Sequence, residues 1–310
     1  MEQNRNEWVM HVWGKKRDAL ELTDTEKFHI YMLDKLQDRQ KKFDKILVNI
    51  ALDDVNDMDL FNFLKEEIGK VLVNDNVEFK YCQNDRKLCE YVTFRPYVFD
   101  RIGEDVNVFY SHFKGYNTFV KVSKESYPTR IAGLCSMFWS YIMYMYSLNM
   151  YDVKNKLKDH SVYCWYVLKI DEETDLLKYF NEYQKFIQGE DVNLKEGVVD
   201  NLHKHCPGSF AWYNLKRIGE VLKDKPYVTD ISYEYIQEQS GKNKVNLCTH
   251  FCESYLMNYL PADECYSVND FNKEFLGIVS TLYAGIYPSK KIGREYLKDF
   301  EKYLIDNELI

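Results

Sequence analysis

The sequence has no excess of basic residues. It contains 41 lysines and arginines against 49 aspartates and glutamates, which gives a formal net charge of −8, and its lysines are spread along the chain. A protein that binds a nucleic-acid duplex usually carries clustered positive charge, because the duplex is a polyanion. The sequence therefore predicts no nucleic-acid partner.

Long apolar runs and secretion signals are also missing. The most apolar stretch, 137–148, is well short of the ~20 residues that a membrane-spanning helix needs, and it carries several hydroxyl groups. No signal peptide precedes Trp8, and cysteines such as Cys164 lie inside apolar runs. We expect a cytoplasmic protein with reduced thiols and no membrane span.

Three common catalytic signatures do not occur. The chain has no Walker phosphate loop, no Gly-x-Gly-x-x-Gly and no Gly-x-Ser-x-Gly. Their absence argues against a P-loop kinase, a dinucleotide oxidoreductase and an α/β-hydrolase.

The first third of the chain alternates apolar runs with amphipathic stretches. Strands are predicted at 9–13, 46–52, 77–81 and 106–110, with a capping box at Thr23 to Glu26 before the first helix. Such a succession predicts an α/β fold with a single Rossmann-like, doubly wound sheet.

After Gly115 the pattern becomes more helical. Helices are predicted at 128–150, at 175–187 and from 248 onward, with a strand-like stretch at 161–170. We predict a nucleotide-sugar-binding half at 1–125, an acceptor-binding half at 126–260 and C-terminal helices at 261–310.

Ligands of doubly wound sheets bind beyond the carboxyl ends of the strands. The fourth predicted strand ends in a segment in which lysine and histidine could neutralise a diphosphate, and a glycine allows the backbone to approach a ligand. The alternative is that the histidine and the lysine merely finish a strand and face solvent. The candidates in this segment are Ser111, His112, Lys114 and Gly115.

The crossover after the third strand is also rich in polar groups. It offers donors and acceptors suited to a base, a ribose or a phosphate, although an aspartate near a helix start is equally suited to cap that helix. The candidates here are Asn84, Asp85, Arg86, Glu90 and Thr93.

Two later segments could position an acceptor sugar. One combines histidine, a Pro-Gly turn and an indole, and the other places a glutamate in a helical stretch. A tight turn into a core strand and an exposed helix glutamate are the alternatives. The candidates are His205, Gly208, Ser209, Trp212 and Glu253.

No metal site is predicted. Asp57-Met-Asp59 spells the Asp-x-Asp that many glycosyltransferases use to hold Mn or Mg, but its position before Leu60 favours helix capping. A zinc site from His203, His205, Cys206, Cys248 and Cys252 would lack any Cys-x2-Cys knuckle.

Several of these segments occur in an order that resembles bacterial and viral polysaccharide glycosyltransferases of the GT-A type. The resemblance spans about residues 8–260 and is carried by motifs rather than by continuous similarity. The matching motifs are Trp13-Gly14, Asn84 followed by Glu90-Tyr-Val-Thr93, Tyr110-Ser-His112-Phe-Lys114-Gly115, and His205-Cys-Pro-Gly208-Ser-Phe-Ala-Trp212.

The resemblance implies a nucleotide-diphosphate sugar as donor and a glycan or other hydroxyl as acceptor. It places Trp13, Gly14, Glu90 and Thr93 near the nucleotide, the Ser-His-x-Lys-Gly segment with Arg86 at the donor phosphates, and His205 to Trp212 with Glu253 on the acceptor side. His112 and Lys114 then stand where related enzymes keep Asp-x-Asp, so a divalent metal is left open. Ala211 stands where an aromatic residue is common.

Inverting transfer would need a base, for which Glu253, His205 and Asp85 are the candidates, whereas retaining transfer needs none. Two other functions stay open. One is a metal-dependent nucleotidyl or phosphoryl transferase that uses acids such as Asp53 and Asp57, and the other is a non-catalytic carbohydrate-binding protein.

Overall fold

The computed structural model describes residues 5–85, 88–113, 150–164, 168–169, 204–205, 211–224, 256 and 260–267. The first four strands match the predicted ones and extend each of them by one to five residues. They are β1 (Arg5–Gly14), β2 (Lys45–Leu52), β3 (Val77–Gln83) and β4 (Val106–His112).

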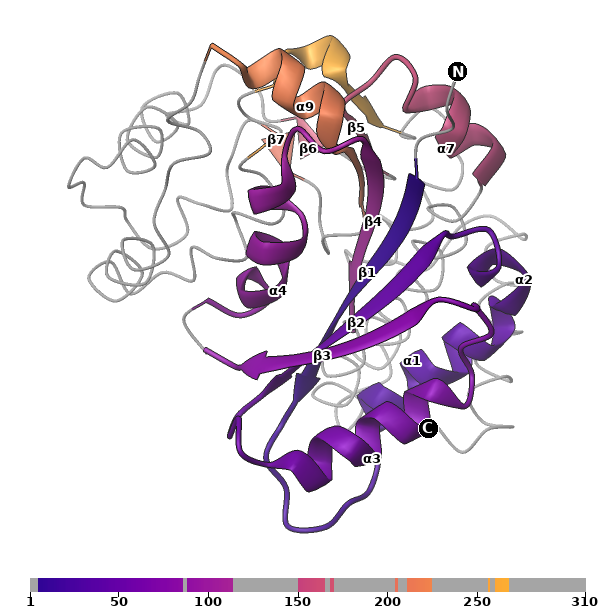
Figure 1. The fold of residues 1–310 in the computed structure, drawn as a ribbon, viewed down its shortest axis with the longest axis vertical. Helices are drawn as coiled ribbons and strands as arrows, with labels where there is room; N and C mark the ends of the chain where they lie inside the picture. Colours follow the sequence, from indigo (N-terminus) through magenta and orange to yellow (C-terminus); the bar gives the residue numbers. More distant parts are fainter. Residues whose placement is uncertain are drawn as a thin grey trace, which may run out of the picture.

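These four strands are parallel and stand in the order β3-β2-β1-β4. The chain first builds outward from β1 to β3 and then returns to place β4 on the other side of β1 (Figure 1). The predicted doubly wound α/β arrangement is confirmed for this half of the sheet.

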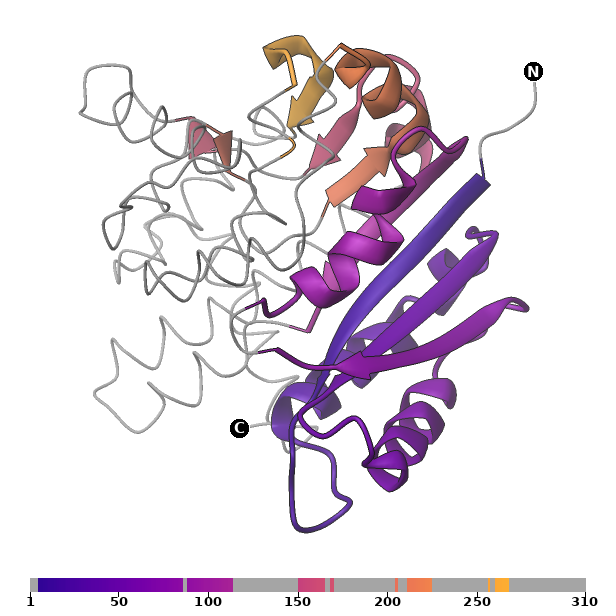
Figure 2. The ribbon, with the colours of Figure 1, turned by 60° about the vertical axis from the view of Figure 1, so that its left-hand side comes forward.

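The connecting helices cover both faces of the sheet (Figure 1 and Figure 2). Those on one face are α1 (Asp24–Lys35), the single turn α2 (Gln37–Gln40) and α3 (Met58–Gly69), and the opposite face carries α4 (Tyr91–Tyr97) and the 3-10 turn η1 (Phe99–Arg101). Alternation along β1 supplies both cores, because Trp8, Met10 and Val12 pack under α1 and α3 while Val9 packs under α4.

Local sequence explains where two helices begin. Thr23 and Glu26 form the predicted capping box, with Thr23 N–H donating to Glu26 Oε2 at 2.7 Å and Glu26 N–H donating to Thr23 Oγ1 at 3.3 Å. Asp57 Oδ1 accepts from Leu60 N at 3.0 Å and caps α3, as its position before Leu60 predicts.

Later parts of the chain complete the same sheet. Strands from the predicted acceptor half and from the C-terminal region extend it beyond β4, which pairs with an antiparallel strand. The further elements are α7 (Met150–Lys156), β5 (Val162–Cys164), β8 (Ala211–Asn214), α9 (Leu215–Leu222), η5 (Ala262–Glu264) and β9 (Cys265–Ser267).

The seven-stranded order is β3-β2-β1-β4-β8-β5-β9, and β6 (Leu168–Lys169) pairs with β7 (Lys204–His205) in a second, two-stranded sheet. The strand-like stretch predicted at 161–170 therefore contains β5 and β6. The helices predicted at 128–150, 175–187 and beyond 248 lie almost entirely outside the described residues. Within the described ranges, no helix has the length and apolar content needed to cross a bilayer.

A contact between two glycines brings α9 against the turn before β4. A Cβ on Gly219 would lie 2.9 Å from Gly103 Cα, and Gly103 N donates to Leu215 O at 2.8 Å. Gly103 itself has a φ of +103°, which side chains rarely tolerate. The helix α9 can approach this turn so closely because neither glycine has a side chain.

We expect Gly219→Ala to lower the free energy of unfolding by about 1–3 kcal/mol, because the added methyl group meets backbone atoms that cannot yield. Gly69→Ala is the matched control, since among the described residues its Cβ would meet only Phe79 Cζ, at 3.9 Å. Urea unfolding of both variants measures the difference. Equal stability of the two variants would contradict the Gly219–Gly103 contact.

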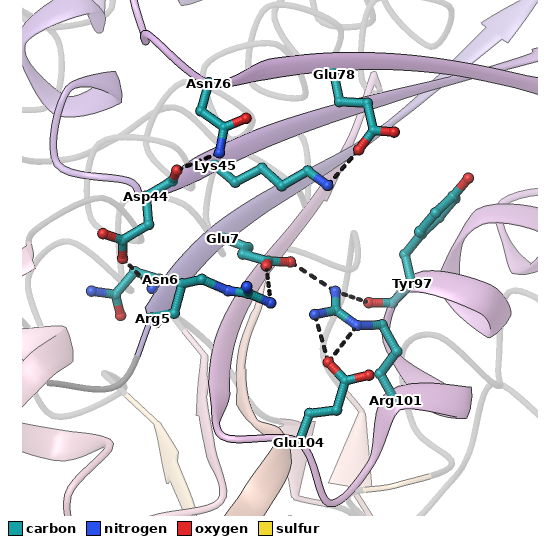
Figure 3. Close-up of polar contacts among 10 residues, drawn as sticks. All are labelled: Arg5, Asn6, Glu7, Asp44, Lys45, Asn76, Glu78, Tyr97, Arg101 and Glu104. Atoms are coloured by element: carbon teal, nitrogen blue, oxygen red, sulfur yellow. Dashed lines mark hydrogen bonds and ion pairs between the residues drawn. The ribbon is translucent and has the colours of Figure 1, made fainter. Parts of the chain in front are cut away.

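The amino-terminal edge of the parallel strands carries an ion-pair network (Figure 3). Glu7 is 3% exposed, and its two carboxylate oxygens accept from Arg5 and Arg101, each at 2.7 Å. Arg101 also binds Glu104 at 2.8 Å. Burial opposes the charge on Arg101, but hydrogen bonds to Glu104 and Glu7 outweigh it and raise the pKa of the guanidinium. The network ties β1 to the segment that leads into β4.

Candidate functional site

The order in which the chain adds strands to the sheet reverses between β1 and β4. Both strands are parallel, but the chain continues from β1 toward β2 and arrives at β4 from β3. In open α/β sheets the crevice at such a switch point, outside the carboxyl ends of the strands, is where ligands bind. The residues that end β1, β2, β3 and β4 are therefore the candidate site.

An exposed tryptophan marks the rim of this edge. Trp13 is 40% exposed, and its indole Nε1 donates to Asp53 Oδ1 at 2.8 Å. Asn84 Nδ2 donates to the same oxygen at 2.8 Å, and Lys16 N donates to Asp53 Oδ2 at 3.2 Å. Asp53 thus holds together the ends of β1, β2 and β3. We call Trp13, Asp53 and Asn84 the rim cluster.

Gln83 fixes the backbone next to the rim cluster. Its Nε2 donates to the carbonyl oxygens of Leu52, Asp53 and Asn84 at 3.3, 3.0 and 3.1 Å, and its Oε1 accepts from Val55 N at 3.1 Å. The rim cluster is therefore set on a backbone that is held by several hydrogen bonds.

Beneath the rim, polar side chains are buried between the sheet and α4. Thr93 is fully buried, and its Oγ1 lies 2.8 Å from His11 Nδ1 and 2.7 Å from Asn49 Nδ2. Asn49 Nδ2 also contacts Cys82 Sγ at 3.3 Å. Together these three contacts link side chains of β1, β2 and β3 to the hydroxyl of Thr93 on α4. We call His11, Asn49 and Thr93 the inner cluster.

Burial determines the charge of His11. Desolvation lowers the pKa of His11 from 6.5 to about 4, because the surrounding protein cannot solvate an imidazolium. Burial also raises the pKa of the Cys82 thiol, against a smaller opposing effect of its contact with Asn49. At neutral pH the inner cluster is therefore uncharged.

The end of β4 presents its side chains to opposite faces. His112 is 5% exposed, lies on the α4 face, and places its Nδ1 3.5 Å from Glu90 Oε1. Tyr110 OH donates to the Glu90 carbonyl at 3.1 Å. Ser111 points to the other face, where its Oγ accepts from Trp8 Nε1 at 2.8 Å. Of Ser111 and His112, only His112 faces α4, because successive side chains of a strand point to opposite faces of the sheet.

The structure thus brings together many of the predicted nucleotide-side residues. Trp13 and Asn84 lie in the rim cluster next to Gly14, whose carbonyl accepts from Asp53 N at 3.1 Å. Thr93 lies in the inner cluster, and Glu90 contacts His112. The carbonyl of Asp85 accepts from Cys89 N at 2.7 Å in the turn that leads to α4.

Other predicted residues lie elsewhere. Trp212 is fully buried, with its ring stacked on Phe43 at 5.3 Å and tilted against Phe109 at 5.4 Å, so the described structure places it in the hydrophobic core. His205 belongs to the small second sheet. The predicted site residues outside the described ranges are Arg86, Lys114, Gly115, Gly208, Ser209 and Glu253.

The residues that sequence reasoning did not single out are His11 and Asn49. Each is a polar residue inside an apolar stretch of a buried strand, at 8–13 in β1 and at 46–52 in β2. That interruption was the available signal, because a polar group inside a central strand needs a buried partner. Asp53 entered the sequence analysis as an acid of the alternative metal-dependent transferase, whereas its bond to Trp13 spans 40 positions of the sequence.

In the described ranges, no group of three or more histidine, cysteine, aspartate or glutamate side chains is arranged to hold a metal ion. The Asp57-Met-Asp59 motif begins α3, with Asp57 as its cap and Asp59 in its first turn. The described position of the motif is therefore that of a helix start.

Comparison with known proteins gives little further guidance. No protein-family model and no curated protein sequence matches the chain. Among solved structures, the mannosyltransferase Ktr4p from S. cerevisiae in complex with GDP aligns with 13% identity and a TM-score of 0.33, over 86% of this chain and 70% of that one. A likeness at this level assigns neither family nor activity to the present chain.

Proposed function

We propose that this protein is a glycosyltransferase that binds a nucleotide-diphosphate sugar across the carboxyl ends of β1, β2 and β4. The sugar would pass to a hydroxyl of a glycan or another acceptor. The observation that carries the proposal is the rim cluster at the switch point, because an exposed indole beside a carboxylate and an amide suits a base or a sugar. The motif order of the sequence supports the same assignment.

Each part of the rim cluster has a chemical counterpart in such a donor. An indole face stacks on a nucleobase or on the apolar face of a sugar ring. Carboxylate and amide groups such as those of Asp53 and Asn84 hydrogen-bond to hydroxyls and to base edges. Because Trp13 Nε1 and Asn84 Nδ2 both donate to Asp53 Oδ1, the three groups are held in place before a ligand arrives.

The departing diphosphate carries the charge that develops during transfer. In the proposed mechanism Lys114, His112 and Arg86 offset that charge, which is electrostatic stabilisation of a leaving group. An inverting reaction would also use Glu253, His205 or Asp85 as the base, and acceptor contacts would come from the segment containing Gly208 and Ser209. Mn or Mg would add to the charge compensation if bound, and a cytoplasmic location fits the use of a sugar nucleotide.

A thermal-shift screen against UDP, GDP, CMP, TDP and their common sugars, with and without Mn, tests the proposal. A ligand that binds only the native state raises the melting temperature. We expect a clear shift with one nucleotide class. Glycan binding without nucleotide binding would instead identify a non-catalytic carbohydrate-binding protein, and activity abolished by a chelator and by Asp57→Ala would favour a metal-dependent nucleotidyl transferase.

Replacing Trp13 tests the rim cluster directly. We expect Trp13→Ala to weaken binding of the nucleotide sugar by about tenfold or more, because stacking of a base on an aromatic ring contributes about 1–3 kcal/mol. Titration calorimetry measures the affinity.

Tyr81→Ala is the control for this change, since Tyr81 is also an exposed aromatic residue, at 46%, but lies on the edge strand β3 and packs beside Phe61. Equal affinities of the two variants would remove Trp13 from the proposed site.

A further inference from the structure

His11 has no part in the proposed mechanism so far. It lies on β1, where it shares a face with Trp13, and its register partners are Asn49 on β2 and His112 on β4. It is 8% exposed. The imidazole of His11 lies at the switch point, two residues before Trp13 on β1. A ligand bound beyond the carboxyl ends of the strands would lie close to it.

Counting hydrogens assigns the tautomer of this imidazole. The hydroxyl of Thr93 has one hydrogen, and its oxygen already accepts from Asn49 Nδ2 at 2.7 Å. Within the described part of the chain, the acceptor that Thr93 reaches with that hydrogen is His11 Nδ1, at 2.8 Å. With the Asn49 amide nitrogen facing Thr93 and Asn49 Oδ1 making no hydrogen bond among the described residues, Thr93 donates to Nδ1, and a neutral His11 carries its proton on Nε2.

The inner cluster thus contains a hydrogen-bond donor, the Nε2–H group of His11, whose protonation state is fixed near neutral pH. Desolvation keeps His11 neutral at pH 7, so Nε2–H does not change with small changes of pH. Within the described residues, His11 forms its hydrogen bond through Nδ1, and Nε2–H is directed to no described acceptor. A buried or half-buried N–H usually has an acceptor, and a bound ligand can supply one.

We propose that His11 is a further ligand-binding residue of the donor site, whose Nε2–H donates to an oxygen atom of the bound nucleotide sugar. Thr93 is the corresponding positioning residue, because its hydroxyl selects the tautomer. The proposal rests on the proposed function and adds to it a neutral hydrogen-bond donor on the α4 face of β1, between the ends of β2 and β4.

Two substitutions separate the ring nitrogens. His11→Asn places an amide near Nδ1 and removes the Nε2 group, whereas His11→Gln places an amide nitrogen near the position of Nε2. Titration calorimetry with UDP-glucose, GDP-mannose and the free diphosphates measures the result. We expect His11→Asn to weaken binding of the nucleotide sugar by about tenfold, as the loss of one well-placed hydrogen bond predicts, and His11→Gln to recover part of it.

Unchanged affinity of the His11→Asn variant would overturn this role while leaving the proposed function in place. If the wild-type protein binds neither these nor any other sugar nucleotide, the proposed function itself fails, and the ligand role of His11 falls with it.

NMR of the protein with 15N-labelled histidine tests the tautomer without any ligand. Of the seven histidines in the chain, the signal of His11 is the one missing in His11→Asn. We expect the pattern of a proton on Nε2, retained in Thr93→Ser and changed in Thr93→Val, which lacks the hydroxyl. A proton on Nδ1, as the opposite orientation of the Asn49 amide would produce, overturns the proposal because Nε2 would then have no hydrogen to donate.

Discussion

Acidification from pH 7 to pH 4 is expected to lower the free energy of unfolding by about 3 kcal/mol through His11 alone. The folded protein lowers the pKa of His11 from 6.5 to about 4, so in this range the unfolded chain binds a proton that the folded protein does not. The contribution of neutral His11 to the free energy of unfolding is therefore fully present above pH 6.5 and is lost progressively as the pH falls toward about 4.

Urea unfolding at a series of pH values measures this dependence. Carboxylates also titrate below pH 5, so the informative quantity is the difference between the wild-type protein and His11→Asn, which lacks the imidazole. We expect a shallower pH dependence in the variant between pH 6.5 and 4. Parallel curves would show that His11 is not buried as a neutral side chain in the folded protein.

Removing Glu7 is expected to cause a comparable or larger loss, of about 3–5 kcal/mol. Glu7 is 3% exposed and contacts two arginines, and Glu7→Ala would leave the partly buried Arg101 with Glu104 as its remaining anionic partner in the network (Figure 3). Thermal and urea unfolding measure the change. The proposed nucleotide site lies at the carboxyl ends of the strands, whereas Glu7 lies near the amino-terminal end of β1. We therefore expect Glu7→Ala to keep its affinity for nucleotide at a temperature at which the variant is folded.

Arg5→Ala is the matched control for this network. The side chain of Arg5 is 56% exposed, and an exposed ion pair contributes only about 0–1 kcal/mol. We therefore expect Arg5→Ala to be nearly neutral. If Arg5→Ala and Glu7→Ala destabilise the protein equally, the buried contact between Glu7 and Arg101 is not what holds β1 to the segment before β4.

Local features of the fold could be predicted from the sequence because their partners are close in the chain. The capping box joins residues three positions apart, and a nearly continuous apolar run, interrupted by Asn49, indicates β2. The helix α9 was not singled out, because its eight residues make little more than two turns, although its cap, in which Asn214 accepts from Arg217 N, is also a local contact.

The candidate site was predictable only in part, because its contacts join distant residues. His11 and Thr93 are 82 positions apart, and Trp13 and Asp53 are 40 apart, so each pair is defined by strand order rather than by a motif. Periodicity does predict that Ser111 and His112 face opposite sides. It cannot tell that Trp212 packs against Phe43, since an aromatic residue in a short strand suits both a core and a binding surface.

The most direct test of the central claim is titration calorimetry of the purified protein with a panel of nucleoside diphosphates and nucleotide-diphosphate sugars. We expect saturable binding of one nucleotide class, at least about tenfold weaker in Trp13→Ala and unchanged in Tyr81→Ala. Absence of binding across the whole panel, or binding that is indifferent to Trp13, would contradict a nucleotide-sugar site at the carboxyl ends of the parallel strands.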